Sequence, residues 1–219
     1  MNPLFTRARA RPLPPLAALA VEPAWVKEFS VAAAGPEQLW IAYGATPDAI
    51  TIGWLTANMT AGSTVQFGTT SGSYPSSASG NATFYKYSAK YTSGLIHHVW
   101  LSGLALGTKY FYRVGDATAW SAEFSFTSSP GVGATLFPYS VGFVADIGEN
   151  SDAASTVAHV VAGLADVDSM IIAGDLSYAS GCESSGCGTW DAFQRLMQPI
   201  AANKPFAINI GNHGQCACS

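Results

Sequence analysis

The chain has 219 residues, which is long enough for one large domain or two small ones. Apolar residues make up 48% and charged residues 11% of it, which excludes a chain that is disordered throughout and predicts a substantial core. The net charge of −4 argues against a nucleic-acid partner, and no apolar run reaches the ~20 residues that a membrane span needs.

Residues 1–35 are rich in Ala, Pro and Arg and show no convincing periodicity, so we expect a leader or a disordered N-terminus. Arg7, Arg9 and Arg11 precede a Pro-interrupted apolar stretch at residues 13–21, an arrangement similar to a signal peptide. A disordered basic segment or a wrongly assigned start explains the same composition, and the sequence leaves these alternatives open.

Two glycosylation triplets, at Asn58 and Asn81, agree with secretion but occur often by chance. Cys182 and Cys187 flank a Ser/Gly-rich loop, and in a secreted protein they are the favoured disulfide pair. A zinc site is less favoured because no Cys-x-x-Cys spacing is present. We therefore expect a secreted or extracellular protein, with the vacuole or lysosome as an alternative.

Residues 36–129 are predicted to form an all-β sandwich, because short alternating segments are separated by Gly, Ser, Thr and Asn turns. The predicted strands are Ile50–Trp54, Thr64–Gly68, Ala82–Ala89, Ile96–Leu101, Tyr110–Val114 and Glu123–Thr127. The stretch Leu104–Tyr110 and the position of Trp54 are similar to the fibronectin type III pattern. His97 and His98 are neighbours on a strand, so one is expected to be packed and the other exposed.

Residues 135–219 change period and predict strand, helix, strand, helix, strand, which is typical of a parallel α/β layer. The predicted strands are Ser140–Ala145, Met170–Ala173 and Pro205–Ile210. The apolar run at Met170 predicts a strand that is buried on both faces. Ser151 or Asp152 is expected to cap the first helix, and the second is expected at about Trp190–Ala202.

Polar side chains follow each of these three strands. Asp146 follows the first, Asp175 and Tyr178 follow the second, and Asn212 and His213 follow the third. Each ending alone is ordinary turn chemistry, because Asp, Asn and Gly favour turns. Three such endings in neighbouring parallel strands predict one site at the carboxyl edge of the sheet.

The segments Asp146-x-Gly148, Gly174-Asp175-x-x-Tyr178 and Gly211-Asn212-His213 resemble the first three signature blocks of the purple acid phosphatases, which are dinuclear metallophosphoesterases. Other metallophosphoesterases usually carry a metal-binding His where this chain has Gly148. The resemblance implies that Tyr178 supplies the missing ligand as a phenolate, a hard anionic donor suited to Fe(III). It also implies a fibronectin type III-like domain before an N-terminal half of a calcineurin-like domain.

The same resemblance implies a role for each residue. Asp146 and Tyr178 would bind the first metal with Asp175, which would bridge to a second metal that also takes Asn212. His213 would lie over the phosphate as the catalytic residue. The cofactors would be Fe(III) plus a divalent Zn, Mn or Fe ion, and the substrate a small phosphomonoester. The family resemblance also leaves a homodimer open.

The chain departs from the family pattern after His213, where Gly214 replaces an acidic residue. The later family blocks Val-x-x-His and Gly-His-x-His, which supply histidine ligands, do not occur. We therefore expect a truncated acid phosphatase-like hydrolase with little activity as the isolated chain. A non-catalytic interaction or regulatory module is the alternative, and a non-purple phosphoesterase is disfavoured by Tyr178 and Gly148.

Overall fold

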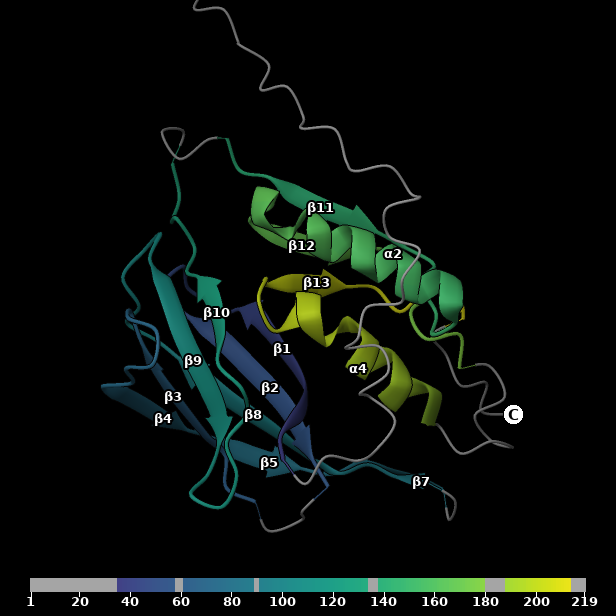
Figure 1. The fold of residues 1–219 in the computed structure, drawn as a ribbon, viewed down its shortest axis with the longest axis horizontal. Coiled ribbons are helices and arrows are strands. Elements are labelled where there is room, and N and C mark those ends of the chain that lie inside the picture. The colour runs from purple at the N-terminus through teal and green to yellow at the C-terminus, as the bar shows by residue number, and fades with distance from the viewer. Residues whose placement is uncertain (1–34, 58–60, 89–90, 134–137, 180–187, 214–219) are drawn as a thin grey trace, which may run out of the picture.

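The computed structural model describes residues 35–57, 61–88, 91–133, 138–179 and 188–213. They form a β-sandwich followed by a small α/β unit (Figure 1). The predicted leader up to residue 34 and all four cysteines, including the predicted Cys182–Cys187 pair, lie outside these ranges. Within them, no helix is both long and apolar enough to cross a bilayer.

Two four-stranded antiparallel sheets make up the sandwich. One has the order β1-β2-β8-β5 and the other β10-β9-β3-β4. The first sheet consists of β1 (Glu37–Tyr43), β2 (Ile50–Thr56), β8 (Leu95–Leu101) and β5 (Asn81–Thr83). The second consists of β10 (Phe124–Thr127), β9 (Lys109–Gly115), β3 (Thr64–Gly68) and β4 (Ser76–Ser79).

The single strand predicted at Ala82–Ala89 is wrong. β5 ends at Thr83, and the chain then enters a separate hairpin of β6 (Lys86–Ser88) and β7 (Tyr91–Thr92). The break falls at two adjacent aromatic residues, Phe84 and Tyr85, which are both more than half exposed. The aromatic and β-prone residues of this stretch suggested one continuous strand. In the structure, however, pairing with β8 ends at Thr83, so the residues that follow leave the sheet.

The predicted core-facing residues of β2 and β9 are confirmed, although Gly53 and Leu55 on the other face of β2 are buried too. Ile52 and Trp54 on β2, and Tyr112 and Val114 on β9, are buried in one cluster. The Tyr110 hydroxyl accepts a hydrogen bond from the Ala105 amide at 3.0 Å, which is the short backward link expected of a tyrosine corner.

The α/β unit is a parallel sheet with the order β11-β12-β13, formed by Val141–Val144, Ser169–Ile172 and Phe206–Ile208. Its helices are α2 (Ser151–Ala162), the short η3 (Leu164–Asp166) and α4 (Gly188–Ala201). The residue that caps α2 is Asn150, not Ser151 or Asp152, because Asn150 still has an extended backbone and its Oδ1 accepts from the Ala153 amide at 2.9 Å.

The expectation that the β12 strand is buried on both faces is wrong for the described residues. Ile172 is 3% exposed, but its neighbour Ile171 is 38% exposed, and Phe143 on β11 is 68% exposed. Strands added in sequential order through crossovers of one hand place both helices on the same face, and α2 and α4 do lie together on one side (Figure 1). The opposite apolar face has no cover among the described residues.

Helix α4 joins the α/β unit to the sandwich by packing on β1. Arg195 forms a two-point ion pair with Glu37, at 2.6 and 2.9 Å. The Tyr112 hydroxyl, in the middle of the sandwich core, donates to the Ala202 carbonyl at 2.7 Å. These contacts fix α4, and through it the start of β13, relative to the sandwich.

Candidate metal centre at the strand ends

Backbone hydrogen bonds connect the loops that follow β11, β12 and β13. The Asp146 amide donates to the Gly174 carbonyl at 3.1 Å, and the Gly148 amide donates to the Leu176 carbonyl at 2.7 Å. The His213 amide donates to Asp175 Oδ1 at 2.9 Å. The three strand ends therefore form one connected edge, as parallel strands in neighbouring positions require.

Three residues of this edge hold a left-handed backbone. Asp146, Asp175 and Tyr178 have φ values of 54°, 47° and 52°. Among the described residues the one other non-glycine residue with positive φ is Gln38. For an L-residue this conformation costs about 1–2 kcal/mol, and such residues gather at functional sites. All three are among the predicted metal ligands.

Two glycines let the loops approach each other closely. A Cβ added at Gly211 would lie 2.2 Å from both the amide nitrogen and Oδ1 of Asp175. A Cβ at Gly174 would lie 3.0 Å from the Gly211 Cα, and both glycines have positive φ. Any larger residue at Gly211 would displace the Asp175 carboxylate.

The side chains of the three loops also touch one another. The Tyr178 hydroxyl donates to Asp146 Oδ1 at 2.8 Å. The rings of Tyr178 and His213 are stacked, with centroids 5.0 Å apart and planes 19° from parallel. The pKa of Tyr178 is raised, first because its phenol donates to the Asp146 carboxylate, then by partial burial and by the negative charges of Asp146 and Asp175.

The structure thus brings Asp146, Asp175, Tyr178 and His213 into direct contact. Asn212 lies in the same turn as His213, and its side chain is exposed. Two carboxylates, a phenol and an amide oxygen form a hard, oxygen-rich donor set, which suits Fe(III) and small divalent cations. Within the described ranges, no group of three or more His, Cys, Asp and Glu side chains is arranged to hold a metal.

Asn209 shapes the third loop and was not singled out from the sequence. Its Oδ1 accepts from the Gly211 amide at 3.0 Å, which forms an Asx turn just before the Asn212-His213 pair. The available signal was the spacing Asn209-x-Gly211, since Asn readily closes such a turn on the residue two positions later.

Comparison with known proteins adds family evidence to this geometry. Residues 36–128 match the family described as the purple acid phosphatase N-terminal domain. The chain is 31% identical to purple acid phosphatase 23 of Arabidopsis thaliana, over 86% of this chain and 49% of that relative. The chain is thus similar to the N-terminal portion of the purple acid phosphatases. The Fe(3+)-Zn(2+) purple acid phosphatase 12 of the same plant is 30% identical over 81% of this chain and 38% of its own length.

A solved structure extends the comparison to the fold. The purple acid phosphatase from yellow lupin (Lupinus luteus) seeds superposes with a TM-score of 0.67 at 24% identity, covering 82% of this chain and 35% of that chain. The match reaches beyond the sandwich and confirms the expected β-sandwich followed by an incomplete α/β domain. The chain spans less than half the length of the purple acid phosphatases it matches.

Proposed function

We propose that the chain carries part of the active site of an acid phosphatase-like hydrolase that uses a dinuclear metal centre to cleave phosphate monoesters. The observation that carries this proposal is the direct contact between Tyr178 and Asp146 across two loops whose ligand positions hold left-handed backbones. An ordinary turn does not require an exposed phenol that points at a carboxylate, so this contact favours a binding role over a purely structural one. The purple acid phosphatase relatives support the same reaction class.

Each donor has a place in this proposal. Asp146 and Tyr178 would hold the first metal, Asp175 would bridge, and Asn212 would bind the second through its amide oxygen. The family member named for Fe(3+) and Zn(2+) supports Fe(III) with a divalent ion, for which Zn, Mn and Fe are candidates. When bound, such a pair clamps a phosphate and supplies hydroxide at neutral or acid pH.

The chain's own residues prepare the site. Asp146 Oδ1 accepts a hydrogen bond from the Tyr178 hydroxyl. It is therefore the nearest proton acceptor if Tyr178 is to become a phenolate. The His213 amide holds one oxygen of Asp175, which restricts how the carboxylate can turn. The His213 ring rests on Tyr178 and is itself exposed, so in its protonated form it can donate to a phosphate oxygen arriving from solvent.

The test is Fe(III) binding followed by visible absorbance. A phenolate on Fe(III) gives a charge-transfer band, which we expect to be faint in this chain because its donor set is partial. Tyr178→Phe should abolish the band, and Tyr139→Phe is the matched control, because the Tyr139 hydroxyl contacts Tyr43 and not the site. An unchanged band in Tyr178→Phe would exclude this residue as a ligand.

Turnover provides a separate test of completeness. We expect little hydrolysis of an aryl phosphate at acid pH when the isolated chain is supplied with iron and zinc. Robust turnover that depends on Asp175 would show that the histidine-bearing family blocks are dispensable. In that case the division of ligands proposed above would be wrong, although the reaction class would stand.

A non-catalytic role is the second candidate, favoured by the uncovered apolar face at Phe143 and Ile171.

We also propose that the protein is secreted or vacuolar; Asn81 is exposed on β5, where a glycan could be attached. A shift of apparent mass on deglycosylation that is lost in Asn81→Gln would test that location.

A further inference from the structure

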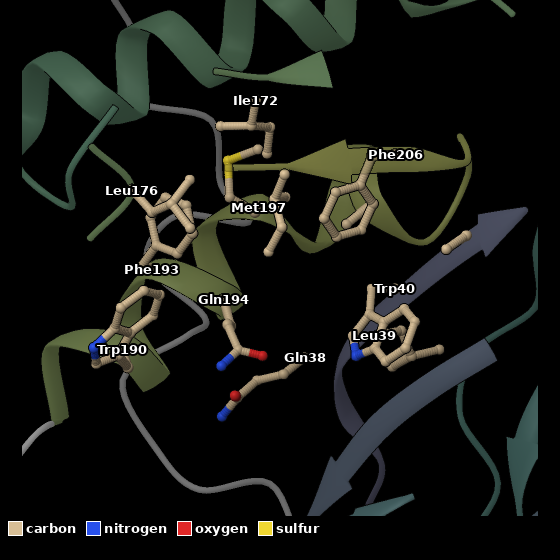
Figure 2. Close-up of a pocket in the computed structure, with 13 residues that line it drawn as sticks. Gln38, Leu39, Trp40, Ile172, Leu176, Trp190, Phe193, Gln194, Met197 and Phe206 are labelled. Carbon is tan, nitrogen blue, oxygen red and sulfur yellow. The ribbon is translucent and has the colours of Figure 1, made fainter. Parts of the chain in front are cut away.

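A cavity of about 320 Å³ lies between β1 of the sandwich and the α/β unit (Figure 2). Four aromatic side chains line it, together with two glutamines on facing elements: Trp40, Trp190, Phe193, Phe206, Gln38 and Gln194. Its volume falls at the lower end of the range for small-molecule sites, which are mostly apolar with a few placed polar groups. None of these residues belongs to the strand-end site.

Gln38 is turned toward this cavity by an irregularity in β1. Between Glu37 and Trp40 the strand contains one residue more than its partner β2, which pairs the same stretch with Leu55 and Gly53. Gln38 sits in this bulge with φ of 57°, the fourth left-handed non-glycine residue of the described chain. Bulges re-aim side chains, and strained positions mark functional sites more often than ordinary strands.

The amide of Gln38 is oriented by two carboxylates. The side chain is 2% exposed, and its Nε2 donates to Glu37 Oε1 at 3.3 Å and to Asp191 Oδ1 at 3.2 Å. Rotating the amide by 180° would set its oxygen against both acceptors, so the assignment of nitrogen and oxygen is fixed by chemistry. In this orientation Oε1 is buried and has no donor among the described residues.

An unpaired buried acceptor is destabilising, and a ligand with a donor would remove that cost. Figure 2 shows the Gln38 amide pointing toward the Gln194 side of the cavity, with the rings of Trp190, Phe193 and Phe206 around the remaining space. An aromatic ring fits such walls, because rings pack edge to face with one another.

We propose that this cavity binds a small aromatic molecule that carries one hydroxyl or ring N–H donor. Oε1 is sealed in the unbound chain, so the Gln38 amide turns slightly to accept the hydrogen bond from the ligand's donor, while the ring packs among Trp40, Phe193 and Phe206. Leu176, which follows Asp175 directly, also lines the cavity, so the cavity borders the loop between two proposed metal ligands. The site needs no metal and stands or falls independently of the phosphatase proposal.

The experiment compares phenol with toluene by isothermal titration calorimetry of the full chain. The two molecules match in size, and only phenol has a donor. We expect saturable binding with phenol at least about tenfold tighter, the ratio that corresponds to 1.4 kcal/mol. Equal affinities, or no saturable binding of phenol, would overturn the proposal and indicate that water or protein atoms satisfy Gln38.

Two variants and a matched control locate the binding. Gln38→Met should bring the phenol-to-toluene ratio to about one, whereas Gln194→Met should keep the preference because Gln38 Oε1 remains. Ala42→Leu, which fills the cavity from β1, should abolish binding of both molecules without touching the Gln38 amide. Phenol binding that survives Ala42→Leu, with circular dichroism showing a folded protein, would place the site elsewhere and reject the proposal.

Discussion

The sandwich and the α/β unit place their polar and apolar groups in opposite ways. In the sandwich His97 is fully buried, stacked on Trp54 with centroids 4.7 Å apart, and both ring nitrogens have hydroxyl partners in Thr56 and Ser63. In the α/β unit Asp146 and Tyr178 are exposed, and the apolar side chain of Phe143 is exposed as well. The sandwich core thus gives the buried His97 a partner for each ring nitrogen, whereas the open unit keeps polar donors available to a ligand and an apolar face available to further protein.

The largest expected effect is in the finished core. Trp54→Ala should reduce the free energy of unfolding by about 3–5 kcal/mol, because a fully buried aromatic ring leaves a large cavity. Urea unfolding followed by circular dichroism measures it. Trp100→Ala on β8 of the same sheet is the control, since Trp100 is 78% exposed, and equal losses in the two variants would contradict the comparison.

The next effect is a pH dependence that arises from His97. Burial lowers its pKa from the ordinary 6.5 to about 4, with Asp116 opposing the shift and His98 adding to it. The unfolded chain therefore binds a proton more readily than the folded one between these pH values. Stability from this residue is complete above pH 6.5 and falls as pH decreases toward 4, by up to about 3 kcal/mol at 1.4 kcal/mol per pKa unit.

Urea midpoints measured from pH 4 to 7 test this dependence. His97→Gln should be less stable at pH 7 and should lose less stability on acidification than the unmodified chain. The exposed His98→Gln should keep most of the original slope, because His98 is the smallest of the causes that shift the pKa of His97. Identical slopes in His97→Gln and the unmodified chain would show that other groups control the acid response.

At the site we expect a moderate effect on stability and a large one on metal binding. Gly211→Ala combines a φ of 67° with a Cβ 2.2 Å from Asp175 Oδ1, so it should cost about 1–3 kcal/mol and weaken Fe(III) binding. Gly72→Ala is the matched control, because Gly72 has φ of 75° and no atom within 4 Å of the added Cβ. If both variants bind Fe(III) as tightly as the unmodified chain, the close approach of Gly211 to Asp175 is not needed for metal binding.

The smallest expected effect is on the uncovered sheet face. Phe143→Ser should change the free energy of unfolding by less than about 0.5 kcal/mol, since the ring is mostly in solvent. Ile172→Ser, on the covered face of the neighbouring β12, should cost about 2–4 kcal/mol or more. A large loss in Phe143→Ser would mean that this face is covered in solution.

The sequence alone indicated most of the core strands, although not β1 or β4, and the polar residues that follow the three parallel strands. Alternation at Ile52 and Trp54 reports a strand with one face in a core, and this signal is local. The order of Asp146, Asp175 with Tyr178, and Asn212 along the chain determined their convergence, because consecutive parallel strands end at one edge. The roles of these residues as metal ligands remain a prediction.

Only the tertiary structure decided how the elements are covered and where they meet. Residue type cannot show whether both faces of β12 are packed, because that depends on which side the helices take. The cavity beside the Gln38 bulge lies where α4 docks on β1, through contacts between residues more than 150 positions apart in the chain. Local periodicity carries no information about such distant contacts, so a cavity lined from both units becomes visible only in the folded chain.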